Sequence, residues 1–118
     1  TRLGVTTLTC QLAGIRLNRV SDVREGRALT AELTNERWNQ RLGYKLKPIK
    51  PKTAARRLLR IAEKYKFTLY EYYLSDHIGH LRLANEFEKL FTEMDEFLFT
   101  LFNEVDSKCS GFGFFVAG

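Results

Sequence analysis

The sequence predicts an α/β fold, in which a parallel β-sheet is part of a sandwich with flanking helices. Apolar residues recur with helical spacing in two segments, 53–65 and 81–105. A run of β-branched and aromatic residues, 67–74, lies between these segments, and a last apolar run, 112–116, follows them. A helix that connects two such runs is typical of a βαβ crossover, which builds a parallel sheet.

Length and composition are those of a globular domain. The chain has 118 residues, enough for one hydrophobic core, and its 44% hydrophobic and 28% charged residues give no reason to expect disorder. No segment approaches the roughly 20 apolar residues that span a bilayer, and the N-terminus lacks a signal-peptide pattern. Cys10 and Cys109 have no metal-ligand spacing around them, which argues against a zinc cluster and a disulfide scaffold. We therefore expect a cytoplasmic protein without a membrane partner.

The first fifty residues differ from the rest of the chain. Glycines divide residues 1–50 into segments that are too short for long helices, so we expect an irregular or cap-like segment there. We expect residues 51–118 to be a fragment of the α/β core. The chain begins without Met, and its last apolar run stops at Gly118, which indicates an internal segment of a longer protein.

Residues 53–65 form the first predicted helix. Its apolar residues share one side of the helix and its charged residues share the other. Thr53 is in the position of an N-cap, where its hydroxyl would accept a hydrogen bond from the first turn. The charged side comprises Arg56, Arg57, Arg60, Glu63 and Lys64.

Residues 67–74 form the predicted strand. The run is aromatic and β-branched but does not alternate strictly, which is typical of a strand covered on both faces in a parallel sheet. Glu71 interrupts this apolar run, and an unpaired buried charge is costly. We therefore expect Glu71 to pair with a basic side chain, or to lie at a sheet end or near a cation.

Residues 81–105 form the second predicted helix, because apolar residues recur there at three- and four-residue steps. Phe99 falls on its polar side, which suggests a packing partner outside this chain. The residues of this region that we expect to be buried are Leu69, Phe87, Leu90, Met94 and Leu101.

Asp76 and His80 are four residues apart where the predicted strand gives way to the second helix. A carboxylate and an imidazole separated by one helical turn can converge on a divalent ion, at the sheet edge where ligands commonly bind. A second interpretation makes Asp76 the N-cap of the helix and His80 a polar residue of its first turn. His77 is adjacent to Asp76 and would point elsewhere.

The segment FTLYEYYLSDHIGH, residues 67–80, followed by MDEFL, residues 94–98, resembles a motif of metalloenzyme-domain proteins. That motif reads E-Y-(F/Y)-L-(T/S)-D-x-x-G-H, followed by a helix with L-D-x-F-L. Its carriers are relatives of cofactor-independent phosphoglycerate mutase, phosphopentomutase and phosphonoacetate hydrolase in the alkaline phosphatase superfamily. Residues 20–34 are more loosely similar to a stretch that precedes the motif in bacterial members.

The resemblance implies a fragment or a degenerate relative of a divalent-metal-dependent phosphoryl-transfer enzyme, which would be a phosphatase, phosphomutase or phosphodiesterase that acts on a phosphorylated small molecule. It also implies that Asp76 and His80 help to hold one of two divalent metal ions, Mn or Zn. The nucleophile and the remaining ligands of such a site are not in this chain. We therefore expect the chain alone to be catalytically inactive and to require the remainder of the catalytic domain as its partner.

The charge distribution suggests an alternative function. Residues 41–66 contain ten Lys or Arg and one acid, whereas residues 71–106 contain nine acids and two bases. The surface formed by Arg56, Arg57, Arg60 and Lys64 could bind nucleic acid or another polyanion, or could simply be solvated. No RNA- or DNA-binding motif is present to support nucleic acid as the ligand.

Overall fold

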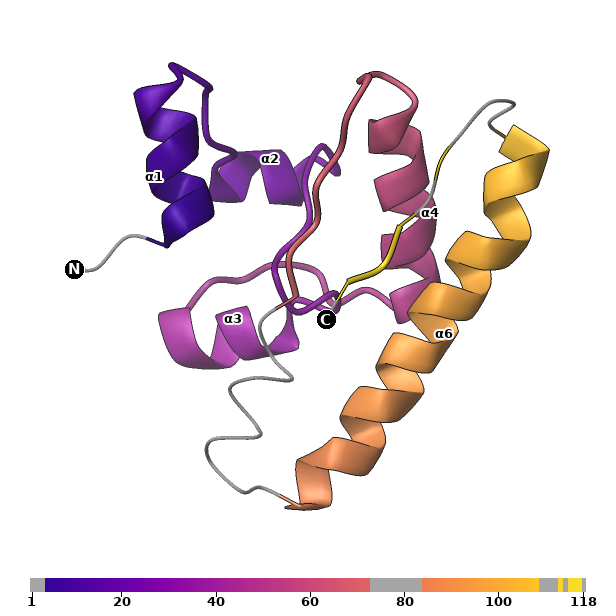
Figure 1. Cartoon of the computed structure of the whole chain (residues 1–118). Helices are drawn as coiled ribbons and strands as arrows, with labels where there is room; N and C mark the ends of the chain where they lie inside the picture. Colours follow the sequence, from indigo (N-terminus) through magenta and orange to yellow (C-terminus); the bar gives the residue numbers. More distant parts are fainter. Residues whose placement is uncertain (1–3, 73–83, 109–112, 114, 118) are drawn as a thin grey trace.

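A computed structural model describes residues 4–72, 84–108, 113 and 115–117, and this part of the chain is helical. Figure 1 shows the two long helices, α4 and α6, side by side, with the shorter helices on the other side of α4. In chain order the helices are α1 Val5–Leu12, α2 Val20–Arg24, α3 Glu36–Leu42, α4 Pro51–Ala62 and α6 Ala84–Lys108.

The main hydrophobic core lies between α4 and α6. Ala54, Ala55 and Leu59 of α4 face Phe97 and Leu101 of α6, and all five side chains are buried. The two alanines have small side chains, so the helix axes can approach closely. Burying one leucine of this kind stabilises the fold by about 1.5–3 kcal/mol, so this interface is the main hydrophobic contribution to stability.

Helix α4 begins two residues earlier than the sequence predicts. Lys50 is its N-cap and Pro51 its first residue, where the missing N–H of proline has no cost and its fixed φ suits a helix. Thr53 is therefore inside the first turn, so its predicted role as the N-cap is wrong. The helix ends at Ala62, three residues before the predicted end.

A smaller cluster packs under α2 and α3. Val23, Ala28 and Leu46 are its buried members, and the Trp38 and Tyr44 rings lie against it with their centroids 6.0 Å apart. Helix α1, in contrast, buries none of its residues. The N-terminal region thus contains less hydrophobic core than the pair of long helices.

Asp22 in α2 links the N-terminal segments through polar contacts. Its buried carboxylate accepts hydrogen bonds from the Arg19 N–H at 2.7 Å and from the guanidinium groups of Arg16 and Arg27. The Arg19 N–H, and after it the two guanidinium groups, hold the pKa of Asp22 below its ordinary value of 3.8. Asp22 is therefore ionised in the folded protein at neutral pH.

The chain turns sharply between residues 30 and 35. Leu33 and Asn35 both have left-handed backbones, with φ of 72° and 71°, and both side chains are buried. The Asn35 side chain donates a hydrogen bond to the Lys47 carbonyl at 3.0 Å, and Leu33 packs into the main core. These contacts hold a backbone conformation that costs non-glycine residues about 1–3 kcal/mol. The turn ends at Asn35, the N-cap of α3.

The predicted parallel-sheet sandwich is wrong for the part of the chain that the structure describes. Residues 67–72 of the predicted strand form neither strand nor helix, and no strand occurs elsewhere among the described residues. In Figure 1 this segment leads from the end of α4 toward the middle of the molecule. It is held by side chains: Tyr70 donates a hydrogen bond to the Thr30 carbonyl at 2.7 Å, and its ring lies 5.8 Å from that of Phe97. The aromatic residues therefore pack against helices and not within a sheet.

The predicted burial holds for two of the five residues. Leu90 and Leu101 are buried, Phe87 and Met94 are half-buried, and Leu69 is 59% exposed. Leu69 points away from the core because its neighbour Tyr70 packs there. None of the helices in the described ranges is long and apolar enough to span a bilayer.

Candidate functional site

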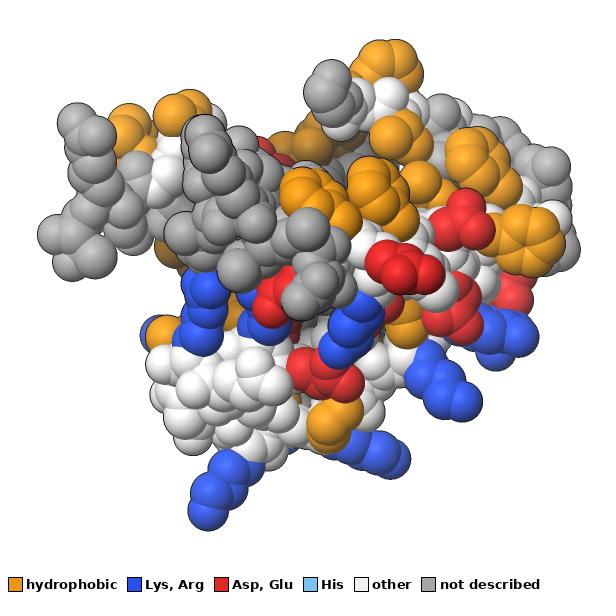
Figure 2. All heavy atoms as spheres, turned by 90° about the horizontal axis from the view of Figure 1, so that it is seen from below, with side chains coloured by type: hydrophobic (Ala, Val, Ile, Leu, Met, Phe, Trp, Pro, Cys, Tyr) orange, Lys and Arg blue, Asp and Glu red, His pale blue; other side chains and the backbone are white. Residues whose placement is uncertain are grey.

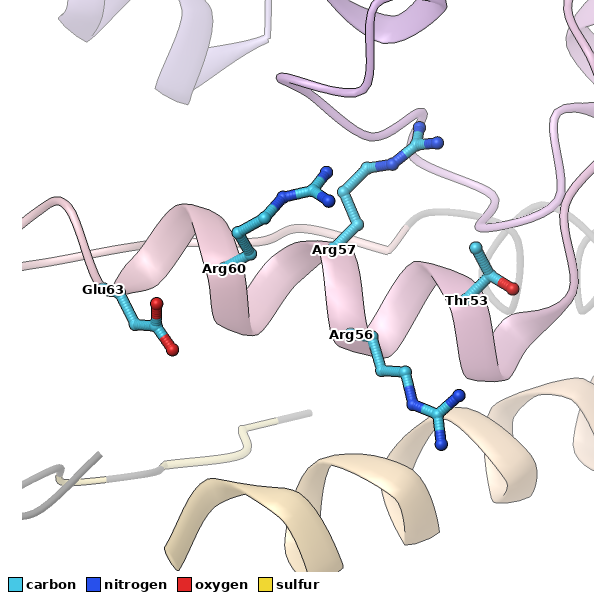
Figure 3. Close-up of a pocket in the computed structure, with 5 residues that line it drawn as sticks. All are labelled: Thr53, Arg56, Arg57, Arg60 and Glu63. Carbon is cyan, nitrogen blue, oxygen red and sulfur yellow. The ribbon is translucent and has the colours of Figure 1, made fainter. Parts of the chain in front are cut away.

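Three arginines of α4 line a hollow of about 610 Å³ on the surface of the molecule. Figure 3 shows Arg57 and Arg60 pointing to one side of α4 and Arg56 pointing toward α6. Thr53 and Glu63 complete the lining. The apolar side of α4 packs on α6, so helical periodicity keeps the three arginines out of the hydrophobic core.

Arg57 is the most deeply placed of the three. Its Nη1 donates hydrogen bonds to the carbonyl oxygens of Val23 at 3.4 Å and Ala28 at 3.3 Å. Partial burial, and then the positive charge of Arg60, lower the pKa of Arg57 below its ordinary value. The guanidinium remains charged at neutral pH, but it is held close to another positive charge.

Arg60 reaches the same backbone segment one helical turn later. Its Nη2 donates a hydrogen bond to the Gly26 carbonyl at 2.9 Å. Gly26 has φ of 76°, and a Cβ on this residue would lie 3.4 Å from Arg60 Nη2. The left-handed backbone of this turn therefore favours glycine, whereas a Cβ would make only an ordinary contact with the arginine.

Arg56 has a different partner from the other two arginines. Its Nη2 lies 2.8 Å from Oε1 of Glu104 on α6, and Nε also donates to this carboxylate. The hydrogen bond to Glu104 raises the pKa of Arg56 above its ordinary value. Arg57 and Arg60, in contrast, form no ion pair with any described carboxylate, so their charges are the ones open to an external anion.

A second polar cluster lies between α3, α6 and the segment before residue 73. Glu32 is buried and accepts a hydrogen bond from the Trp38 N–H at 2.9 Å, and burial raises its pKa above 4.5. Burial, and then the Glu93 carboxylate, raise the pKa of Tyr72 to about 12. The Tyr72 hydroxyl is buried and has no hydrogen-bond partner in the described structure. The described cations of this cluster already have acidic partners: Arg37 pairs with Glu86, and Lys89 pairs with Glu36 and Glu93.

Of the other predicted site residues, Lys64 and Glu71 are described by the structure. The predicted metal ligands Asp76 and His80, and His77 beside them, lie outside the described residues. Within the described ranges, no group of three or more His, Cys, Asp or Glu could hold a metal ion. Lys64, predicted with the arginines, is exposed but does not line the hollow. Glu71 accepts a hydrogen bond from the Thr6 hydroxyl at 2.6 Å.

Sequence reasoning found the arginines but missed the groups that distinguish them. Glu104 lies 48 residues from Arg56, and Gly26 lies 34 residues from Arg60, so no local pattern reveals either contact. Thr53, which the sequence predicts as the N-cap of α4, lines the hollow instead. The only local signal was the glycine after Glu25, which indicates a turn but not its partner.

Comparison of the chain with protein-family models, with curated proteins and with solved structures gives no significant match. The site must therefore be interpreted from its own geometry.

Proposed function

We propose that this chain binds a small phosphorylated molecule, and that Arg57 and Arg60 hold its phosphate group. The observation that carries the proposal is the pair itself: two guanidinium groups that share one hollow and form no ion pair with a described carboxylate. An anion between them would offset their mutual repulsion, which already lowers the pKa of Arg57.

The hydrogen-bonding capacity of the pair supports phosphate as the ligand. Each guanidinium has five N–H donors, and the contacts in the structure use Nη1 of Arg57 and Nη2 of Arg60. The remaining N–H groups are available for phosphate oxygens, which arginine binds with well-matched geometry. The carbonyl contacts restrain both side chains before the ligand arrives, which lowers the entropic cost of binding.

The shape of the site favours a small ligand over nucleic acid. A hollow of about 610 Å³ is within the range of small-molecule sites, roughly 300–1,000 Å³. A nucleic-acid backbone would require a row of cations along a track, whereas Arg56 in the same hollow is already paired with Glu104.

A small phosphorylated ligand is also the kind of substrate implied by the resemblance to the alkaline phosphatase superfamily, and that resemblance stays a prediction. The cytoplasmic setting is likewise a prediction from the sequence.

Calorimetric titration with inorganic pyrophosphate tests the proposal. We expect Arg57→Gln and Arg60→Gln each to weaken binding by roughly tenfold or more, since a hydrogen bond to a charged group contributes about 1.5–3 kcal/mol. Lys45→Gln is the matched control, because it removes the same charge from an exposed position away from the hollow. Equal weakening in all three variants would reduce the effect to net charge and overturn the proposal. Tight binding of single-stranded oligonucleotides with a steep salt dependence would assign the surface to nucleic acid instead.

A further inference from the structure

Helix α6 has a second face that carries exposed side chains, on which the Phe91 ring stacks on the Phe87 ring of the same helix with their centroids 6.1 Å apart. Glu88, Phe91, Asp95 and Phe99 follow one another at three- and four-residue steps, so they form one row along the helix. The Phe91 and Phe99 side chains are 64% and 68% exposed. We call this row the outer face of α6; it lies away from Leu90, Phe97 and Leu101, which face α4.

Several acids of α6 have basic partners, although exposed Glu96, off the outer face, forms no ion pair with a described residue. Glu86, Glu93 and Glu104 each have a basic partner, which is Arg37, Lys89 and Arg56, respectively. Glu88 and Asp95, in contrast, form no ion pair with any described residue. Figure 2 shows acidic and hydrophobic side chains interspersed on the side of the molecule where α6 lies.

Both components of the outer face point to a partner. A single exposed phenylalanine is ordinary, but each aromatic side chain can bury about 150–250 Å² on docking. Two of them in one row, separated by a carboxylate, offer an apolar surface with a specific charge pattern. A complementary surface has apolar side chains with Lys or Arg at the same helical spacing.

The charge pattern disfavours three other occupants of the face. A second copy that pairs through the same face would bring four carboxylates without basic partners into one interface, which is unfavourable. Anionic lipid and nucleic acid are repelled for the same reason. The basic helix α4 of a second copy cannot dock either, because Ala54 and Leu59 on its apolar side are already buried.

We propose that the outer face of α6 binds a cationic amphipathic helix of another polypeptide. The apolar side of that helix covers Phe91 and Phe99, and its lysines or arginines pair with Glu88 and Asp95. The surface is separate from the arginine cluster, and this inference does not depend on the proposed phosphate binding.

The test uses two synthetic helical peptides of Leu and Ala that carry either Lys or Glu at the polar positions. Fluorescence anisotropy with the full chain should show binding of the Lys peptide only, and binding should weaken with added salt. We expect Phe91→Ser together with Phe99→Ser, and separately Glu88→Gln with Asp95→Asn, to weaken this binding at least tenfold. These residues are exposed, so the variants should keep the fold, which circular dichroism checks.

Phe67→Ser combined with Glu25→Gln is the control, since it removes an exposed phenylalanine and an exposed acid elsewhere. Binding that is weakened equally by the control, or that the Glu peptide shares, would overturn the proposal. Failure of both peptides to bind would also overturn it. A concentration-dependent dimer in sedimentation, abolished by the two serine substitutions, would assign the face to a second copy of the chain.

Discussion

Helix α4 contacts its two neighbours by different physical means. Toward α6 it presents Ala54, Ala55 and Leu59, which are buried against apolar side chains. Toward residues 23–28 it extends Arg57 and Arg60, whose N–H groups donate to backbone carbonyls. The first contact depends on the removal of apolar surface from water, and the second depends on the position of a few carbonyl oxygens. The α4–α6 pair should therefore determine stability, and the arginine contacts should determine what the surface can bind.

The largest expected effect is on the apolar side. Leu101→Ala should lower the free energy of unfolding by about 2–5 kcal/mol, because it leaves a cavity among buried side chains. Phe99→Ala on the same helix is the control, and should change stability by no more than about 0.5 kcal/mol because its side chain is exposed. Urea unfolding of both variants measures the difference. Equal losses would mean that the two faces of α6 are not distinct.

A smaller effect is expected on the polar side, at Asp22. Asp22→Asn should lower the melting temperature by a few degrees at pH 7, since two arginines lose their charged partner. The folded-state pKa of Asp22 lies below 3.8, so its ionisation stabilises the protein above that pH. This contribution is lost as the pH falls through the folded pKa, and the difference between the two proteins should shrink accordingly.

Thermal unfolding from pH 7 to pH 2 measures this difference. A difference that stayed constant over this range would show that Asp22 acts through packing and not through its charge.

The smallest expected effect concerns residues 73–83, which lie outside the described residues. If Asp76 and His80 share a metal ion, calorimetry should show weak binding of Mn or Zn, because two side chains leave most of the coordination sphere to water. Binding should rise with pH through the histidine titration near about 6.5 and should be lost in Asp76→Ala and in His80→Ala. His77→Ala is the matched control. Unchanged binding in the Asp76 and His80 variants would leave Asp76 as a helix cap.

The same contrast explains what the sequence could predict. Periodicity located both ends of α4 to within three residues and correctly predicted a helix for the described part of residues 81–105, because one apolar side is enough to identify a helix that packs. It failed for residues 67–72, where tyrosines suggested a strand. High β-propensity reports a side chain that fits a half-buried surface, and Tyr70 finds that surface on Phe97 of α6. Propensity therefore identified packing but not its geometry.

The sequence identified the charged side of α4, but it did not show that the three arginines on this side have different partners. Arg56, Arg57 and Arg60 are equivalent in any local pattern. They differ because α6 brings Glu104 to Arg56, while the turn at Gly26 brings a carbonyl to Arg60. Both contacts depend on tertiary structure, which residue spacing along one helix does not contain.

The left-handed backbone at Leu33 limits which residues can replace it as the sequence varies. Glycine would relieve the backbone cost of about 1–3 kcal/mol but would empty a core position worth about 2–5 kcal/mol. Valine and isoleucine are disfavoured at this φ, and asparagine would bury an amide where no polar partner is provided. Position 33 therefore requires an apolar side chain that is not branched at Cβ. Leucine or methionine should recur there among natural variants of this chain.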